Sequence, residues 1–253
     1  MTMTSHAGVR WHPPSEQTRI GDAEVHVWRV SLTPPDSRIR QLASLLNEDE
    51  TRRSERFYFP EHRERFIVGR GMLRLILGRY LDADPANLCF GYSAFGKPFL
   101  AGKEAGNELR FNLAHSQDMA VYAFTLRRQI GIDVEYLRAD MSGDEIAERF
   151  FAAKEVAALR ALPPANRIEG FFNCWTRKEA YIKARGEGLS FPLDKFVVSL
   201  NPGEPAALLN VLDAPEESAR WSLRELTPGP GYASALAVEG HQWNLKQWEA
   251  KGL

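Results

Sequence analysis

Two carboxylates lie two residues apart in the segment 131–135, at Asp133 and Glu135. On a β-strand, side chains two residues apart project from the same face, so these acids would lie together while Ile132 and Val134 pack behind them. Neighbouring carboxylates repel each other unless a cation or a proton separates them, and oxygen ligands of this kind suit Mg²⁺. The spacing therefore indicates a metal site on a strand, with a solvated strand face that holds two acids as the alternative.

A second set of charged residues falls in the segment 175–183. Glu179 and Lys183 are four residues apart, so on a helix they share one face and could form an ordinary surface salt bridge. The functional alternative is a carboxylate and an ammonium group that face one bound phosphate and its metal, with Lys178 reaching the same anion from an adjoining face. Trp175 precedes Glu179 by one turn, and we expect it to anchor the core rather than to stack on a ligand.

Further polar and cationic side chains could complete a phosphate site. His115 and Ser116 fall in a predicted turn at 114–118, and Arg53, Arg56 and Lys97 could add positive charge. Each of these residues alone is more often a solvated charge or a turn residue. The sequence has no G-x-S-x-G nucleophile elbow, no P-loop and no Rossmann glycine fingerprint. A nucleotide would therefore have to be held by side chains and strand ends.

The elements that must position these residues alternate in type along the chain. Residue patterns predict strands at 23–30, 88–93, 111–113, 119–126, 130–135, 196–200, 221–226 and 232–238. Helical spacing and caps predict helices at 38–46, from Asn47 to before Pro60, and at 61–80, 144–151, 153–162 and 168–185. The order of strand, helices and strands occurs twice, which predicts two similar α/β lobes that meet near residues 127–130.

Composition places the chain among ordinary globular proteins. It has 253 residues, of which 44% are hydrophobic and 26% charged. The net charge of −1 argues against a nucleic-acid partner, although eight arginines without a lysine between residues 52 and 79 indicate a local anion site. Two cysteines far apart argue against a disulfide framework or a zinc site. The sequence shows no signal peptide and no membrane span, so we expect a cytoplasmic protein without a membrane partner.

Five short motifs in this order resemble the 4′-phosphopantetheinyl transferase superfamily, in its two-lobed Sfp type with the W/KEA variant of the last motif. They are FGKP at 95–98, FNLAHS at 111–116, GIDVE at 131–135, ERFF at 148–151 and WTRKEAYIKARGEGLS at 175–190. The resemblance spans roughly residues 45–200. Two departures are Ala114, where the family often has serine, and Phe66, where some members have a small hydroxyl residue.

The resemblance implies a fold and its division. The fold would be α/β (α+β), with two pseudo-symmetric lobes, each a small, mainly antiparallel sheet packed with helices, and the active site between them. Residues 1–20 would be a flexible leader, residues 21–128 the N-terminal lobe that contacts coenzyme A, and residues 129–253 the C-terminal lobe with the metal and catalytic residues.

The resemblance also implies roles for individual residues. The metal ligands would be Asp133, Glu135 and Glu179, and the metal Mg²⁺, with Mn²⁺ as an alternative. Lys178 and Lys183 would lie around the coenzyme A pyrophosphate. The remaining coenzyme A contacts would come from Arg53, Arg56, Lys97, His115 and Ser116.

The implied reaction is the transfer of 4′-phosphopantetheine from coenzyme A to a serine of an apo acyl or peptidyl carrier protein by a monomer. In it, 3′,5′-ADP leaves, Asp133 takes part as a metal ligand, and Lys183 stabilises or protonates the leaving group. Glu179, or a water bound to the metal, would take the serine proton. The carrier would dock on the segment after Glu135, which includes Arg138 and Met141. A non-catalytic coenzyme A-binding module and a metal-dependent phosphohydrolase are the alternatives, and fatty acid, polyketide, peptide and siderophore pathways all remain open.

Overall fold

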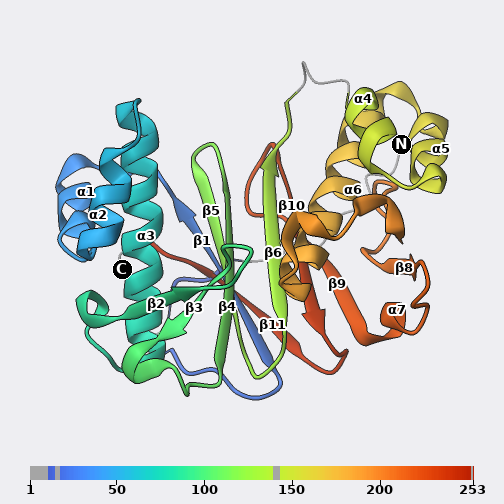
Figure 1. Cartoon of the computed structure of the whole chain (residues 1–253). Coiled ribbons are helices and arrows are strands. Elements are labelled where there is room, and N and C mark those ends of the chain that lie inside the picture. Colours follow the sequence, from blue (N-terminus) through green and yellow to red (C-terminus); the bar gives the residue numbers. More distant parts are fainter. Residues whose placement is uncertain (1–10, 15–17, 139–142, 252) are drawn as a thin grey trace.

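The computed structural model describes residues 11–14, 18–138, 143–251 and 253. Its first half runs from one strand through three helices to four more strands (Figure 1). These elements are β1 (Glu24–Ser31), α1 (Asp36–Ala43), α2 (Glu48–Glu55), α3 (Pro60–Leu81), β2 (Cys89–Tyr92), β3 (Pro98–Ala101), β4 (Leu109–Ser116) and β5 (Met119–Leu126).

The second half repeats this order, with one short helix and one last strand added. Its elements are β6 (Ile130–Tyr136), α4 (Asp144–Phe150), α5 (Ala153–Ala161), α6 (Pro164–Arg185), β7 (Phe196–Val198), β8 (Leu208–Val211), α7 (Glu217–Arg220), β9 (Trp221–Leu226), β10 (Tyr232–Glu239) and β11 (Asn244–Glu249). We call β1–β5 with their helices the first lobe, and β6–β10 with theirs the second lobe.

The two lobes are built on the same plan. The first sheet has the strand order β11-β1-β5-β4 and the second has β6-β10-β9. In both lobes, the last of the lobe's own three sheet strands, β5 or β10, lies between the other two. In each lobe the three strands are antiparallel, and a separate two-stranded hairpin, β2–β3 or β7–β8, precedes the last two of them. The prediction of two similar lobes with small, mainly antiparallel sheets and packed helices is therefore confirmed.

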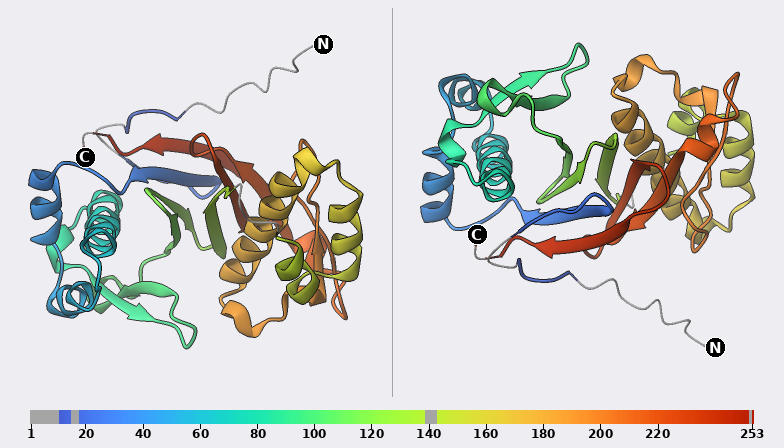
Figure 2. Two further views of the ribbon diagram at one scale, coloured as in Figure 1. Left: turned by 90° about the horizontal axis from the view of Figure 1, so that it is seen from above. Right: turned by 90° about the horizontal axis from the view of Figure 1, so that it is seen from below.

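The lobes pack as layers around three groups of buried side chains. One group lies between α3 and the first sheet, and another between α6 and the second sheet. The third group joins the sheets and includes Val27 from β1 and Ile132 from β6. Figure 2 shows the result, in which the strands lie in the middle and the helices of each lobe lie at opposite ends.

Local sequence signals explain where the helices begin. Asn47 caps α2 through a reciprocal capping box with Glu50, as its position in the sequence predicts. Proline occupies the first turn of both long helices, where the missing N–H costs nothing. Gly186 ends α6 in the left-handed conformation, with φ of 78°. This end fixes where the residues after Lys183 leave the helix.

Three strands were not predicted, and β4 extends beyond its predicted range at both ends. The strands β3, β8 and β11 are missing from the sequence interpretation, and β4 continues to Ser116. His115 and Ser116 therefore lie on the end of a strand and not in a turn. A turn follows at residues 117–118, where Gln117 has a φ of 49°.

The last strand crosses back to the first lobe, since β11 pairs in parallel with β1. His12, within the predicted leader, forms a β-bridge with Trp248 on the outer edge of β11. The predicted boundary at 128/129 did not anticipate this return, and the division of the chain into domains stays a prediction. Within the described residues, none of the helices has the length and apolar character needed to cross a membrane.

Candidate active site

A cleft of about 950 Å³ lies over the seam where the two lobes meet. The seam is held by a hydrogen bond of 2.8 Å from the Ile132 amide on β6 to Asn112 Oδ1 on β4. The α2–α3 segment and the β2–β3 hairpin contribute one wall, and α6 contributes the other. Seven of the predicted site residues line this cleft: Arg53, Lys97, His115, Asp133, Glu135, Glu179 and Lys183.

The three predicted acids reach the cleft from two elements. Asp133 and Glu135 project from β6, as the alternation of the strand predicts, while Ile132 and Val134 are buried on the other face. Glu179 projects from α6, which packs across this strand. Asp133 is only 4% exposed, so it is the acid at the bottom of the cleft.

Gly131 explains how α6 comes so close to β6. A Cβ at this position would lie 2.1 Å from the carbonyl oxygen of Ala180 and 2.3 Å from the amide nitrogen of Ala184, which is far inside van der Waals contact. Only glycine allows this approach, and the approach brings the side chains of the last turns of α6 over the acids of the strand.

Lys183 forms an ion pair with the buried acid. Its Nζ lies 2.6 Å from Asp133 Oδ1, and the other carboxylate oxygen, Oδ2, is buried without a hydrogen-bond partner. Burial raises the pKa of Asp133 to about 6 although Lys183 opposes the shift, and Glu135 raises it further. Burial also raises the pKa of Glu179. Lys183 thus compensates the burial of Asp133 and Glu179 only in part.

These features fit a divalent cation. The donors are all carboxylate oxygens, as Mg²⁺ prefers, and Asp133 Oδ2 is a buried acceptor that lacks a donor. Within the described residues, however, the His, Cys, Asp and Glu side chains nowhere form a ready cluster of three that could hold a metal. The Lys183 ammonium lies next to Asp133, and the three acids line one cleft without forming such a cluster.

Ser116 supports the site through Glu135. Its hydroxyl donates to Glu135 Oε2 at 2.8 Å and accepts from the Tyr136 amide at 3.1 Å. The hydroxyl therefore donates one hydrogen bond and accepts another across the seam. Ser116 orients one of the acids and does not line the cleft itself.

Lys97 ties the hairpin of the first lobe to the second lobe. Its Nζ donates to the carbonyl oxygens of Ile130, at 2.9 Å, and Lys183, at 2.7 Å. Burial lowers the pKa of this ammonium to about 8, since no carboxylate compensates its charge. The side chain reaches the predicted cleft, but its hydrogen bonds show that it also fixes the two lobes together.

Besides Ser116, two predicted residues do not line the cleft. Arg56 lines a separate hollow beside Arg52 and Phe57, at the end of α2. Lys178 is fully buried on the far side of α6, where its Nζ lies 2.7 Å from Glu155 Oε2 and donates to the carbonyl oxygens of Leu193 and Phe196. The structure therefore does not bring Lys178 to the cleft, because adjacent residues on a helix point about 100° apart and Glu179 is the one that faces the cleft.

Two arginines in the cleft wall were not singled out as site residues. Arg65 forms an ion pair of 2.7 Å with Asp118 and, with Lys183, adds to the desolvation that lowers the pKa of His115. Arg70 is 7% exposed and lies between Glu50 and Tyr92. The only signal for them was the arginine-rich stretch 52–79, which does not tell which members face a cleft.

Trp175 packs within the second lobe, as predicted, and also borders the cleft. Its ring stacks on Phe171 at 6.2 Å and lies near Phe151, so it belongs to the packing of the second lobe. It is only partly buried and also lines the cleft.

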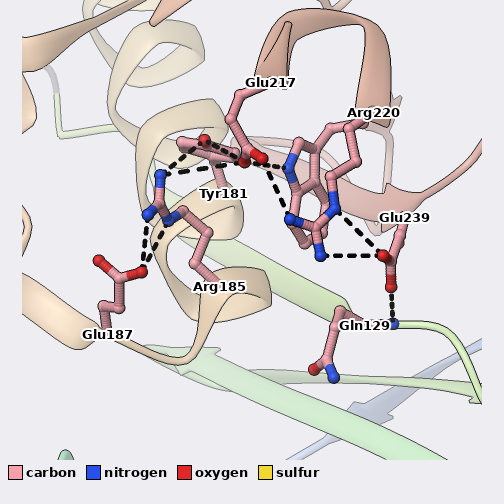
Figure 3. A network of polar contacts seen from close by, with 8 residues as sticks. Gln129, Tyr181, Arg185, Glu187, Glu217, Arg220 and Glu239 are labelled. Atoms are coloured by element: carbon pink, nitrogen blue, oxygen red, sulfur yellow. Dashed lines mark hydrogen bonds and ion pairs between the residues drawn. The ribbon is translucent and has the colours of Figure 1, made fainter. Parts of the chain in front are cut away.

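A polar network fixes the end of α6 just beyond Lys183 (Figure 3). Arg185 donates through Nε and Nη2 to Glu187 Oε1, at 3.0 and 2.7 Å, and through Nη1 to the Tyr181 hydroxyl, at 3.2 Å. The network continues along the second lobe through Glu217, Arg220 and Glu239 to the Gln129 amide. It anchors the loop after α6, of which Gly186, Gly188 and Ser190 line the cleft.

Two family models together span most of the chain. Residues 30–126 match the model described as 4′-phosphopantetheinyl transferase, N-terminal, and residues 129–237 match the model of the 4′-phosphopantetheinyl transferase superfamily. The first model ends and the second begins at the connection between the lobes.

Curated proteins with similar sequences carry the same description. The chain is 45% identical to the 4′-phosphopantetheinyl transferase HetI of Nostoc sp., over 94% of this chain and 97% of that protein. It is 30% identical to a 4′-phosphopantetheinyl transferase of Bacillus subtilis, over 80% of this chain and 91% of that protein. It is 28% identical to the 4′-phosphopantetheinyl transferase Sfp of Bacillus subtilis strain 168, over 77% and 83% of the two chains. The chain therefore belongs to the 4′-phosphopantetheinyl transferase family, in its Sfp type.

Proposed function

We propose that this protein transfers the 4′-phosphopantetheine group of coenzyme A to a serine of an apo acyl or peptidyl carrier protein and releases 3′,5′-ADP. The supporting observation is the cleft at the lobe seam, where acids from β6 and α6 face basic side chains from the first lobe. One chain supplies both walls of this cleft, which is consistent with a monomeric enzyme.

In the proposed reaction the serine hydroxyl oxygen attacks the β-phosphorus of coenzyme A. The bond from this phosphorus to the oxygen of 3′,5′-ADP breaks, and the serine proton passes to a base. Glu179 suits this role because burial raises its pKa, which makes the carboxylate a better proton acceptor. Lys183, at the bottom of the cleft, would stabilise the negative charge of the leaving phosphate or protonate it.

The residues proposed to hold Mg²⁺, or Mn²⁺ in its place, are Asp133, Glu135 and Glu179. The unpartnered Oδ2 of Asp133 supports this assignment, and Ser116 would keep Glu135 in position. When bound, the metal would neutralise charge on the pyrophosphate and on the acids. Lys183 would then exchange part of its contact with Asp133 for the phosphate.

The phosphates of coenzyme A would be bound from the side of the first lobe. Arg53 and His115 line the cleft and offer donor side chains, and Lys97 holds the hairpin next to them. Arg56, in the hollow that it shares with Arg53, does not reach the cleft and would contribute mainly to the positive potential at this end.

The direct test is to incubate the protein with coenzyme A, MgCl₂ and a panel of apo carrier proteins, and to measure the mass of each carrier. A mass gain of one phosphopantetheine group on the carrier serine is the expected result. Cleavage of coenzyme A without carrier modification would instead identify a phosphohydrolase. Binding of coenzyme A without any reaction would identify a non-catalytic module, and either outcome would refute the proposal.

Variants test the acids within the same assay. We expect Asp133→Asn and Glu179→Gln to lower kcat by at least about a hundredfold, because several kcal/mol of transition-state stabilisation are lost with a metal ligand. Glu169→Gln is the matched control, since Glu169 is an exposed acid on the same helix. Near-normal turnover in a folded Asp133→Asn variant would remove the metal assignment while leaving transferase activity intact.

A further inference from the structure

We propose that Arg70 is a positioning residue that holds the β2–β3 hairpin in place. The tip of this hairpin, residues 93–97, can then form part of the wall of the cleft. The inference concerns a residue whose ion pair is with Glu50 and not with the three acids of the cleft. It rests on the proposed function only for its kinetic consequence, because the hairpin's position can be measured without any substrate.

Arg70 connects three elements of the first lobe from a buried position on α3. Its Nε lies 3.0 Å from Glu50 Oε1 on α2, and its Nη2 donates to the Tyr92 hydroxyl on β2. The guanidinium also lies 5.0 Å from the centre of the Phe90 ring and 5.6 Å from that of Tyr92. A charged group that is 7% exposed is fixed by these contacts, and so is the hairpin that supplies two of them.

The second lobe provides an internal comparison. Glu50 and Glu155 are both the third residue of their helices, and each is paired with a buried cation at the fifteenth residue of a 22-residue helix, Arg74 or Lys178. Both cations donate to carbonyl oxygens of the segment that precedes or begins the following hairpin. The two glutamates therefore occupy equivalent positions in the two lobes.

The lobes differ at the second oxygen of this glutamate. In the second lobe, Glu155 Oε1 accepts directly from the Val198 amide on β7, at 2.8 Å, and the eleventh residue of the long helix is Cys174. In the first lobe the eleventh residue is Arg70, and its guanidinium stands between Glu50 and the hairpin. The β2–β3 hairpin is thus held by the guanidinium of Arg70, whereas the β7–β8 hairpin is hydrogen-bonded directly to Glu155.

The hairpin tip then meets the second lobe. Lys97 Nζ donates to the Lys183 carbonyl oxygen at 2.7 Å, and a Cβ on Gly188 would lie 3.2 Å from the Cβ of Phe95. Contacts thus run from Arg70 through Tyr92 and the tip to the backbone of a residue in the site. Because the tip lies on the wall of the cleft, a hairpin that moves would disturb the binding of coenzyme A more than the chemical step.

The variants for the test are Arg70→Met, which keeps the length of the side chain, and Tyr92→Phe, which removes only the hydroxyl that links Arg70 to the hairpin. Arg63→Met, at an exposed arginine of the same helix, is the control. In ligand-free full-length protein, hydrogen exchange of the amides at 89–101 should be faster in both variants than in the wild type and the control. The amides of α6 should exchange at unchanged rates.

In the transfer assay, Arg70→Met should raise the KM for coenzyme A about tenfold and change kcat by less than about threefold. Tyr92→Phe should shift the KM in the same direction by a smaller factor. A raised KM with unchanged hairpin exchange would overturn the proposal, because Arg70 would then contact the ligand directly. A lower Tm with unchanged KM and unchanged hairpin exchange would also overturn it, since Arg70 would then only stabilise the lobe.

If Arg70→Met does not fold, Tyr92→Phe decides alone, because Tyr92 is 46% exposed and its ring remains in place. Should the wild-type protein neither bind coenzyme A nor modify a carrier, the proposed function fails, and the exchange experiment still tests the role of Arg70.

Discussion

Arg53 and Arg56 lie three residues apart in the same basic stretch, but only Arg53 reaches the cleft. Arg53 lines the cleft, with its guanidinium 5.4 Å from the centre of the Phe66 ring, and it also borders the hollow at the end of α2, which Arg56 lines without reaching the cleft. Within the described residues, neither guanidinium is paired with a carboxylate. The two residues were predicted to act alike, and their positions now predict different effects.

We expect Arg53→Ala to raise the KM for coenzyme A about tenfold, since a hydrogen bond to a charged group contributes about 1.5–3 kcal/mol. Arg56→Ala should change it by less than about twofold, as is usual for an exposed charge at a distance. Steady-state kinetics with coenzyme A and with dephospho-coenzyme A would also tell whether Arg53 reads the 3′-phosphate. Equal effects of the two substitutions would place the ligand elsewhere.

Lys97 predicts a pH dependence. Burial lowers the pKa of its ammonium to about 8, so the free protein loses this charge as the pH rises above that value, well below the ordinary range for lysine. Because kcat/KM reports ionisation of the free enzyme, its value for coenzyme A should fall above pH 8. Lys97→Gln, which cannot titrate, should have a low kcat/KM that does not fall above pH 8. If kcat/KM of Lys97→Gln still fell above pH 8, the ionisation would belong to another group.

At the scale of elements, each lobe holds its long helix with a buried ion pair. Glu155 shows the arrangement most fully: it accepts from the Ala152 and Val198 amides and pairs with Lys178. The ion pair thereby joins α5, α6 and β7 and sets the rotation of α6 that turns Glu179 towards the cleft. Lys178 thus acts on the site through the packing of the helix.

Lys178→Met should lower the free energy of unfolding by about 3–5 kcal/mol, because it leaves the Glu155 carboxylate buried without a cation. Lys178→Arg should recover much of this loss, since Arg74 fills the equivalent position of the first lobe. Urea titration measures both, with Lys154→Met, at an exposed lysine of α5, as the control. If Lys178→Arg were fully stable but raised the KM for coenzyme A, the lysine would contact the ligand after all.

Local periodicity accounts for what the sequence could predict. The alternation at 131–135 placed Asp133 and Glu135 on one face, and the spacing of Glu179 and Lys183 placed them on one side of α6. The burial of Lys178 depends on Glu155 in a preceding helix, and β11 depends on a pairing with β1 at the other end of the chain. No window of neighbouring residues contains either partner, so pattern alone could not predict these features.

At the scale of the whole molecule, two lobes of one plan contribute different residues to the cleft. Counted along the paired strands, Trp28 has the register position in the first sheet that Asp133 has in the second. Leu75 is the sixteenth residue of α3, as Glu179 is of α6. The first lobe therefore has apolar residues where the second has acids, and its contribution to the site is the basic wall and the hairpin.

The proposed reaction also requires that a second protein, the carrier, reaches the acids of the cleft. The segment after Glu135 was predicted to dock it. Tyr136 is 41% exposed and packs edge-on against Tyr232 at 5.2 Å, and Arg138 is exposed, while Met141 lies outside the described residues. An exposed aromatic and a cation directly beside the site suit a partner with an acidic surface.

We expect Arg138→Glu to raise the KM for the carrier while the KM for coenzyme A stays unchanged, because a charge at the rim of an interface acts mainly on the rate of encounter. The salt dependence of the carrier KM should become weaker at the same time, because the variant has less electrostatic attraction to an acidic carrier for salt to screen. Separate titrations of carrier and coenzyme A at several ionic strengths measure this, with Arg40→Glu, at an exposed arginine of α1, as the control. A carrier KM that responds to both substitutions alike would reflect net charge, and one that responds to neither would mean that the carrier docks on another face.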